Sequence, residues 1–200
     1  MKIFILFVIS YLFGSISFAF LFTYFLKGKD IRKIGDGNPG AANVARNVGK
    51  IWGIVVWAGD TLKGVLPIFI GKWWGIENII ILTFIGCFAI LGHCYSIFLK
   101  FKGGKGAATS GGVILCLMPF LFPLVIILWF IAQKINPRSP KVLLSCVVIF
   151  FVFLFFVYRD KFFFYSISTL LLILTGVIVN KNIITEMRRK KIGNMEKKNL

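Results

Sequence analysis

Long apolar runs separated by short polar connections dominate the chain. Six apolar segments are visible, at 3–26, 51–71, 78–99, 107–132, 142–157 and 162–180. Each is close to the ~20 residues that an α-helix needs to cross the hydrocarbon core of a bilayer. The sequence shows no internal repeat and no separate domain. The pattern predicts an all-α, polytopic membrane helix bundle that forms one domain over residues 1–200, with residues 181–200 as a basic tail.

The first segment begins directly after Met1 and Lys2. Its apolar run, from Ile3 to Leu26, is longer than the core of a signal peptide, and it lacks a small-x-small cleavage site. We therefore expect it to be a retained membrane helix.

Composition strengthens this prediction. Apolar residues make up 58% of the chain, Phe occurs 23 times and the mean hydropathy is +0.87. A soluble domain of this size could not bury so much apolar surface, which excludes a soluble enzyme, a secreted disulfide scaffold and a disordered chain. The four cysteines lack metal-ligand spacing and are typical of small buried side chains.

The net charge of +17 fits basic residues that flank membrane helices better than it fits nucleic-acid binding. Connection 27–50 carries six Lys/Arg, 100–106 three, 133–141 three and the tail seven. Six crossings would place 12 basic residues on one side and 11 on the other. If 107–132 crosses twice, the division becomes 19 against 4, which the positive-inside rule favours.

Pro119 and Pro123 stand in the middle of that segment, where a helix is expected to break. We therefore predict seven transmembrane helices, two of them short ones from 107–135, with the amino terminus outside and the tail in the cytoplasm. A bundle of six helices stays open as the alternative.

The first of three unusual polar segments runs from Gly35 to Arg46. Its glycines let backbone N–H groups approach an anion, and Asn38 and Asn43 add neutral donors. Arg46 can hold a phosphate with two parallel hydrogen bonds. An ordinary Gly/Asn-rich turn would explain the glycines alone.

The second segment surrounds Lys105 with Gly103, Gly104 and Gly106, just before an expected helix that contains Thr109. A helix N-terminus with unpaired N–H groups beside a lysine is suited to phosphate. The spacing is not that of a Walker motif. A basic loop at the membrane edge is the alternative, but it leaves the glycines unexplained.

The remaining polar candidates are weaker. Asp60 and Lys63 lie three residues apart on one predicted membrane helix, so they form either an ion pair or part of the same anionic pocket. His93 is better suited to orienting its neighbours than to acting as a general base. Asn182 opens a basic tail that anionic lipid alone would explain.

Taken together, these segments resemble the bacterial membrane acyl-phosphate:glycerol-3-phosphate acyltransferases over nearly the whole chain. The resemblance is carried by Phe13-Gly14-Ser15, Asp30-Ile31-Arg32-Lys33, the Asn/Gly segment with Arg46, Asp60-x-Leu62-Lys63-Gly64, Gly92-His93, Phe98 to Thr109, and Asn182-Ile183. It implies seven membrane helices in the bacterial plasma membrane, with three cytoplasmic motifs around one active site.

The resemblance also implies the reaction. An acyl chain moves from acyl phosphate to the 1-hydroxyl of glycerol 3-phosphate, giving lysophosphatidic acid and phosphate for phospholipid synthesis, with neither coenzyme A nor a metal or other cofactor. The expected partners are these two substrates, membrane lipid and an upstream enzyme that produces acyl phosphate, and no nucleic acid. The catalytic residues expected are Arg46, Asp36 and Lys105. The substrate-binding residues expected are Asn38, Asn43, Lys63, His93, Gly103, Gly104, Gly106, Thr109 and Asn182.

The chain departs from the family pattern at a few positions. Asp36 replaces the usual Ser, Ala42 the usual Thr, and Val179 a His of the third motif, while Ser17 stands where Pro is usual. A carboxylate beside phosphates repels them unless it is protonated, paired with Arg46 or used as a base. Two alternatives therefore stay open, namely a diverged relative with another acceptor or no turnover, and a small anion transporter.

Overall fold

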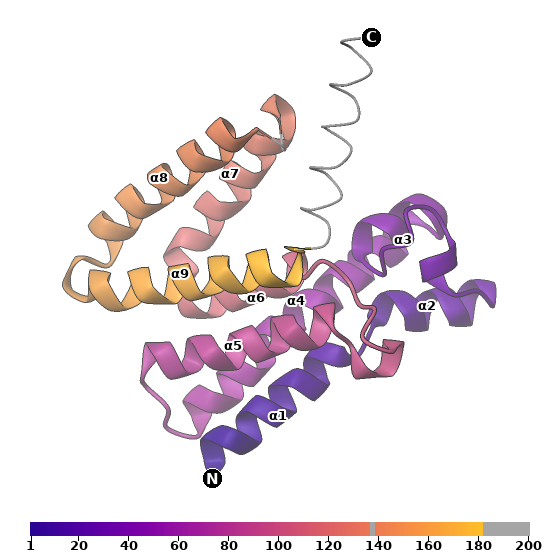
Figure 1. Ribbon diagram of the computed structural model, residues 1–200, viewed down its shortest axis with the longest axis horizontal. Helices are drawn as coiled ribbons and strands as arrows, with labels where there is room; N and C mark the ends of the chain where they lie inside the picture. Colours follow the sequence, from indigo (N-terminus) through magenta and orange to yellow (C-terminus); the bar gives the residue numbers. More distant parts are fainter. Residues whose placement is uncertain (137–138, 182–200) are drawn as a thin grey trace.

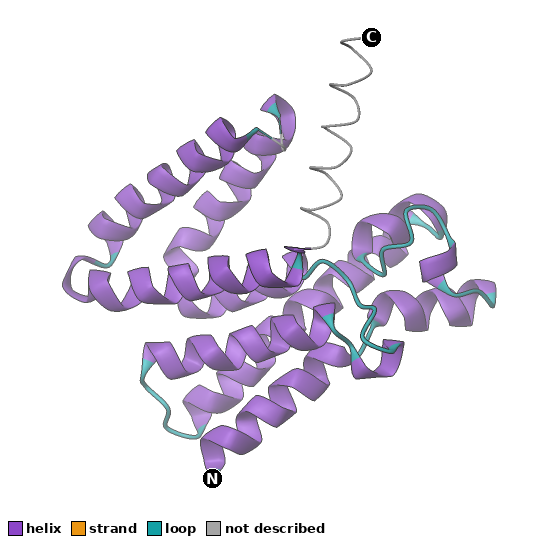
Figure 2. Cartoon of the chain, in the orientation of Figure 1, coloured by secondary structure: helices purple, strands orange, loops and turns teal. Residues whose placement is uncertain are grey.

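The computed structural model describes residues 1–136 and 139–181, and all regular structure within these ranges is helical (Figure 2). The α-helices are α1 (Lys2–Ser15), α2 (Phe18–Lys27), α3 (Ala41–Asn47), α4 (Lys50–Trp73), α5 (Ile79–Cys94), α6 (Ala107–Leu117), α7 (Phe122–Ile135), α8 (Pro140–Val157) and α9 (Phe162–Val179). Four short 3-10 helices connect them: η1 (Ile31–Lys33), η2 (Ile97–Leu99), η3 (Pro119–Leu121) and η4 (Arg159–Lys161).

All six predicted apolar segments are helical, and the break predicted inside 107–132 is confirmed. Helix α6 ends at Leu117 and α7 begins at Phe122, with η3 between them. Lys72, at the end of α4, donates from its Nζ to the carbonyl oxygen of Cys116 at 2.9 Å. The cation thus satisfies a carbonyl of the last turn of α6, which has no partner within the helix itself.

The first segment, expected as one helix over 3–26, is instead interrupted after Ser15. Ser17 has extended backbone angles, and its side chain caps α2 by accepting from the N–H of Phe20. Because the helix is interrupted here, the buried carbonyl of Ser15 is free to accept a hydrogen bond from Ser96 Oγ at 2.5 Å. The end of α1 is therefore tied to the connection that follows α5.

Close helix contacts at glycines organise the bundle. A Cβ atom on Gly64 of α4 would overlap the carbonyl oxygen of Thr109, and one on Gly112 of α6 would overlap that of Thr61. The two backbones therefore touch where only a hydrogen atom fits, as is typical of helix pairs in membranes. This contact places the first turn of α6 against the middle of α4.

Helices α1 and α5 meet in the same way. Gly14 packs on the carbonyl of Ala89, and Gly92 packs on the carbonyl of Tyr11. The hydroxyl of Tyr11 also donates to the carbonyl of Tyr95 at 2.7 Å. The contact fixes the end of α5, which leads into the second polar segment.

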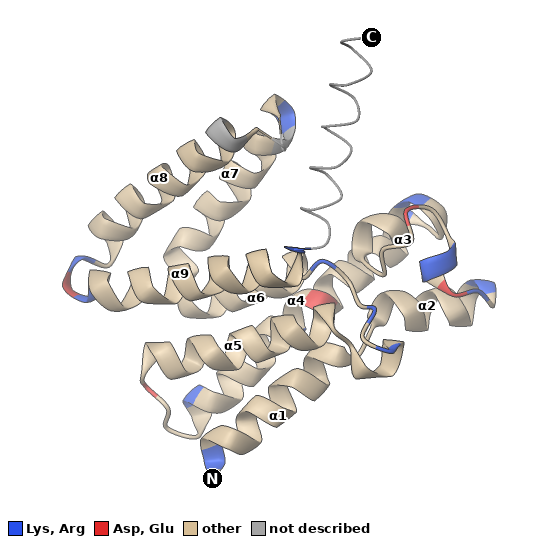
Figure 3. Cartoon of the chain, viewed as in Figure 1, with Lys and Arg blue, Asp and Glu red and all other residues tan. Residues whose placement is uncertain are grey.

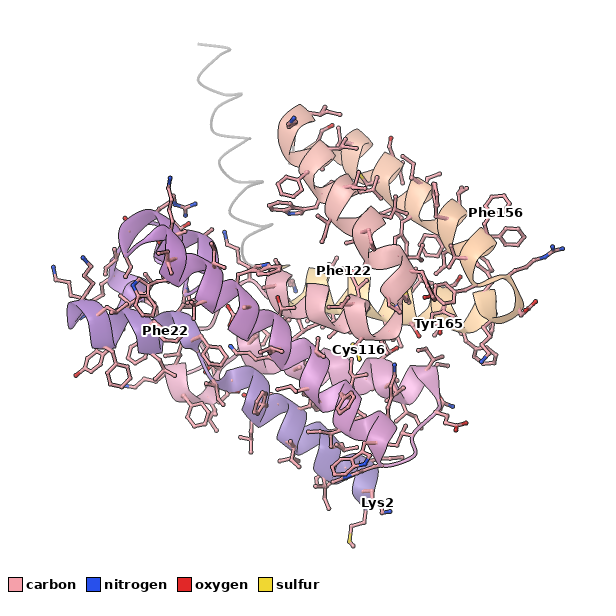
Figure 4. All side chains as sticks on the ribbon, turned by 180° about the vertical axis from the view of Figure 1, so that it is seen from behind. Lys2, Phe22, Cys116, Phe122, Phe156 and Tyr165 are labelled. Carbon is pink, nitrogen blue, oxygen red and sulfur yellow. The ribbon has the colours of Figure 1, made fainter. Side chains whose placement is uncertain are left out.

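The polar segments gather at one end of the bundle (Figures 1 and 3). Connection 28–49, the loop 95–106 and the end of α9 lie there, whereas the N-terminus, the α4–α5 turn and η4 lie at the opposite end. Figure 4 shows the same division from behind, with Phe22 and Lys2 at opposite ends. The break between α6 and α7 reverses the direction of the chain once more, so that α9 ends at the same end of the bundle as the two loops (Figure 1).

The flanks of the bundle are apolar. Exposed Phe, Ile, Leu, Val and Trp side chains cover α7, α8 and α9, and Phe156 of α8 is 75% exposed and projects outward in Figure 4. Within residues 1–136 and 139–181, four helical spans are long and apolar enough to cross a membrane, at Lys2–Lys27, Lys50–Trp73, Ile79–Leu99 and Arg159–Val179. Three shorter apolar helices accompany them, at Ala107–Leu117, Pro119–Ala132 and Val142–Val157.

We predict that Gly112→Ala lowers the thermal unfolding temperature of the protein in detergent, because the new methyl group overlaps the backbone of α4. Overpacking of this kind costs about 1–3 kcal/mol. Gly176→Ala is the matched control, since a Cβ atom on this α9 glycine meets nothing within 4 Å. Equal unfolding temperatures for the two variants would contradict the account of the α4–α6 contact.

Candidate active site at the polar end of the bundle

The first polar segment is built around the amide of Asn43, which is fully buried. Its Nδ2 donates to the carbonyls of Ile34 at 2.9 Å and Asn38 at 3.1 Å, and its Oδ1 accepts from Asn47 Nδ2 at 2.8 Å. From the sequence we expected Asn43 to bind substrate. In the structure its amide is hydrogen-bonded to the loop that precedes α3. The observed contacts of Asn43 are therefore structural, and they fix the conformation of that loop.

Asp36 and Arg46 form an exposed ion pair on this frame. Arg46 Nη2 lies 2.6 Å from Asp36 Oδ2, and the two side chains are 58% and 46% exposed. Asp36 Oδ1 also accepts from the N–H of Asn38 at 3.1 Å, closing a local turn. A carboxylate beside phosphates was expected to be protonated, paired with Arg46 or used as a base. The structure shows the pairing with Arg46.

The second polar segment folds back on the end of α5. The N–H of Gly103 donates to the carbonyl of Cys94 at 3.0 Å, and that of Gly104 donates to the carbonyl of His93 at 3.1 Å. Both groups were expected to face an anion. They instead satisfy carbonyls of the last turn of α5, and the side chain of Lys105 is left exposed beside them.

The N-terminus of α6 follows at once. Gly106 occupies the position before the helix with φ +79°, a conformation that glycine adopts without strain, and no side chain caps the helix there. The first N–H groups of an α-helix have no partner within it and carry partial positive charge. Thr109 in this first turn is fully buried, and its Oγ1 has no hydrogen-bond partner in the structure. This turn retains the character of an anion-binding site.

A cluster of buried charged side chains lies next to that turn. Lys63 Nζ is 2.7 Å from Asp60 Oδ1, and both residues of α4 are at most 2% exposed. His93 Nδ1 approaches the same oxygen at 3.6 Å, and the ring of Phe18 faces Lys63 at 5.1 Å. Of the two alternatives left open for Asp60 and Lys63, the ion pair is the one observed. A Cβ atom on Gly104 would overlap His93 Nε2, so the cluster also supports the loop.

Two residues that the sequence analysis did not select connect the segments. Arg32 Nη1 donates to the carbonyl of Leu99 at 2.9 Å, which joins η1 to η2. Asn180 Nδ2, at the end of α9, donates to the carbonyl of Lys105 at 3.3 Å. Arg32 belongs to a stretch that supports the family resemblance but was not chosen as a site residue, and Asn180 lies two positions before the chosen Asn182. Asn182 itself lies outside the described residues.

The predicted site residues therefore form two groups at one end of the bundle. Lys63, His93, Gly104 and Thr109 lie around the start of α6, whereas Asp36 and Arg46 belong to the segment packed on the first turns of α4. Gly53 contacts α3 and Gly64 contacts α6, and these glycines are about 16 Å apart along the axis of α4. The fold and this end together define a multi-pass membrane protein whose two basic polar segments and uncapped α6 N-terminus lie at one end of the bundle (Figure 3).

Comparison with known proteins identifies the class further. Residues 4–189 match the sequence profile of the family described as glycerol-3-phosphate acyltransferase. A glycerol-3-phosphate acyltransferase of Thermosipho melanesiensis is 40% identical over 152 residues, which cover 76% of this chain and 74% of that protein. One of Aquifex aeolicus is 45% identical over 136 residues, covering 64% and 70% of the two chains.

Two crystal structures of PlsY (YgiH), an integral membrane glycerol 3-phosphate acyltransferase, share the fold. The glycerol 3-phosphate form has a TM-score of 0.75 and 32% identity, covering 96% of this chain and 94% of that one. The lysophosphatidic acid form has a TM-score of 0.73, 31% identity, and covers 96% and 93%. The chain belongs to the glycerol-3-phosphate acyltransferase family of integral membrane enzymes. It is accordingly an acyltransferase of phospholipid synthesis.

We predict that Gly104→Ala impairs acyl transfer, because the added methyl group displaces either His93 or the loop that carries Lys105. A fall of about tenfold in kcat/KM corresponds to about 1.4 kcal/mol of lost interaction. Gly111→Ala, one turn into α6, is the control, since its Cβ atom makes ordinary contact with Phe122 at 3.9 Å. If both variants are fully active, the packing of Gly104 on His93 has no role in the site.

Proposed function

We propose that this acyltransferase takes its acyl chain from acyl phosphate and transfers it to the 1-hydroxyl of glycerol 3-phosphate. The products are lysophosphatidic acid and inorganic phosphate. The observation that supports this proposal best is the position of the uncapped first turn of α6, beside Lys105 and next to the buried Lys63. Both substrates carry a phosphate. A site built from N–H groups and cations is suited to binding two phosphate groups.

The reaction needs no enzyme nucleophile. The hydroxyl oxygen of glycerol 3-phosphate attacks the carbonyl carbon of acyl phosphate, and a tetrahedral intermediate forms. The bond from that carbon to the bridging oxygen then breaks, and phosphate leaves with the electron pair. A phosphate oxygen accepts the hydroxyl proton. The protein therefore contributes orientation and electrostatic stabilisation, which supply much of the rate of such transfers.

Arg46 has the role of holding one phosphate. Its guanidinium has five donors in a planar fork, so it can bind an anion while Nη2 stays paired with Asp36. Asp36 orients Arg46 and offsets part of its charge, and Asn38 lies in the same turn. In this proposal Asp36 acts through Arg46 and is not the base.

Lys105 and the first turn of α6 hold the glycerol 3-phosphate. Gly106 lets the backbone enter the helix without a side chain in the way, and Asn180 fixes the carbonyl of Lys105. The buried ion pair of Lys63 with Asp60 lies next to this turn and balances its own charge, so Lys105 is the exposed cation beside the turn. His93 supports the loop through its contact with Gly104.

The acyl chain of the donor stays in the membrane. The exposed faces of α7, α8 and α9 are apolar, so a chain held there meets the same surroundings as a lipid tail. Only the carboxyl phosphate then has to reach the polar end of the bundle. A site at the end of a membrane bundle suits a substrate with one apolar and one doubly charged part.

We also propose that this end faces the cytoplasm of a bacterial cell, with the amino terminus outside and the tail inside. The division of 19 basic residues against 4 supports this orientation. Glycerol 3-phosphate and the enzyme that produces acyl phosphate would then reach the site from the cytoplasm.

The direct test is transfer by the purified protein, in detergent, from palmitoyl phosphate to radiolabelled glycerol 3-phosphate. We expect labelled lysophosphatidic acid with palmitoyl phosphate and none with palmitoyl coenzyme A. Arg46→Ala should lower kcat/KM by about 100-fold, as loss of a preorganised charged donor does. Lys105→Ala should raise the KM for glycerol 3-phosphate by about tenfold.

Lys29→Ala provides the control, because it removes an equal charge from an exposed position before η1. Asp36→Asn separates the roles of the carboxylate. A variant that retains transfer shows that Asp36 is not the base, whereas loss of activity equal to that of Arg46→Ala would contradict the proposed role. Absence of product with palmitoyl phosphate would contradict the proposed donor.

The orientation is tested by single cysteines in a variant in which the four native cysteines are replaced. A cysteine at Lys29 should react with a membrane-impermeant maleimide only after the cells are opened. One at Glu77, in the turn at the opposite end, should react in intact cells, because the two ends face different compartments. The reverse pattern would overturn the orientation.

A further inference from the structure

The two polar segments of the site come from separate parts of the chain, yet a phosphate at Lys105 has to meet a group held by Arg46. Arg32, which precedes the first segment, bonds to the connection that carries the second. Its Nη1 donates to the carbonyl of Leu99 at 2.9 Å. Leu99 is buried and ends η2, directly before the left-handed residues Lys100 and Phe101 that turn the chain toward Lys105.

Asp30 holds the Arg32 side chain in place. Arg32 Nη2 donates to Asp30 Oδ2 at 2.6 Å, and Nε lies 3.0 Å from both carboxylate oxygens. The same carboxylate accepts from the backbone N–H of Arg32 at 2.9 Å and so caps η1. The ring of Phe20 lies 5.8 Å from the guanidinium carbon. The guanidinium is thus oriented before any substrate binds.

Both side chains of the Asp30–Arg32 pair are mostly covered, at 21% and 28% exposed. The hydrogen bonds from Arg32 lower the pKa of Asp30 against the opposing effect of burial, and the hydrogen bond with Asp30 raises the pKa of Arg32. The pair is therefore ionised at neutral pH, and its contribution to stability is lost only as the pH falls below the usual carboxyl value of 3.8.

The connection continues to Arg46. Ile31, next to Arg32, is fully buried, and its carbonyl lies 3.4 Å from Asn43 Nδ2. Asn43 belongs to α3, one turn before Arg46. A continuous path of contacts thus runs from the carbonyl of Leu99 through Arg32 and η1 to the helix that carries Arg46.

We propose that Asp30 and Arg32 are positioning residues that set the distance between the Lys105 loop and the Arg46 helix. Neither touches substrate in this account. The inference rests on the proposed function in that it takes the two segments to hold the two reacting groups. Beyond that function, we infer that the guanidinium of Arg32 fixes the spacing between the two segments.

The experiment compares Arg32→Gln, Asp30→Asn and the double variant with the wild type. Binding of glycerol 3-phosphate is measured by calorimetry, and kcat and KM are measured by acyl transfer. Each single variant should lower kcat/KM by about tenfold, the size expected when a charge-assisted hydrogen bond is lost. The double variant should be no worse than Arg32→Gln, because the two residues act as one unit. Lys33→Gln is the control for loss of one exposed positive charge.

Asp30→Asn is the decisive variant. If Arg32 bound the phosphate directly, removing the neighbouring carboxylate would strengthen binding, and such a result would overturn the proposal. Unchanged kinetics in both variants, or a lowered unfolding temperature with unchanged kinetics, would also overturn it. Should Arg32→Gln fail to fold, Asp30→Asn retains the guanidinium and carries the test. Calorimetry measures the binding of glycerol 3-phosphate without any acyl donor. A wrong donor assignment therefore leaves this readout unchanged, and failure of the proposed function can be told apart from failure of the positioning role.

Discussion

The close backbone contact of α4 with α6 is the constraint on which the site depends. Lipid offers no hydrophobic drive for helices to associate, so they pack closely only where small residues let their backbones meet. Gly64 and Gly112 provide that contact, and it places the start of α6 beside Lys63. The corresponding contact of α1 with α5, at Gly14 and Gly92, fixes the end of α5. Two rigid helix pairs thereby fix the two helix ends between which the loop containing Lys105 runs.

Charge at this end is arranged in local pairs. Asp30 pairs with Arg32, Asp36 with Arg46 and Asp60 with Lys63, and each carboxylate lies within ten residues of its cation. The chain has seven acidic residues in all, so these pairs account for three of them. The pairs differ in role, since the first joins two segments, the second is exposed toward solvent and the third is buried next to the first turn of α6. The remaining basic residues of these segments provide the net positive charge that attracts anionic substrates.

The sequence allowed the helices and their grouping to be predicted, but not the local pairing of donors. Apolar length indicated every span, and the charge count together with Pro119 correctly indicated the break between α6 and α7. The break after Ser15 was missed because two small serines, Ser15 and Ser17, do not stand out within the long apolar run from Ile3 to Leu26. The roles expected of Asn43 and of the Gly103 and Gly104 amides depended on which carbonyls lie nearby, which only the folded backbone decides. Arg32 was not selected because its partner, the carbonyl of Leu99, is a backbone atom 67 residues away.

The central claim is that the two polar segments hold two phosphates at one end of the bundle at the same time. A crystal structure with glycerol 3-phosphate and a non-hydrolysable acyl phosphonate tests it most directly. We expect density for both phosphorus groups, one beside Arg46 and one at the first turn of α6 near Lys105, with the acyl chain against an apolar flank. Density for either group at the opposite end, or binding of the two ligands that is mutually exclusive, would contradict the claim.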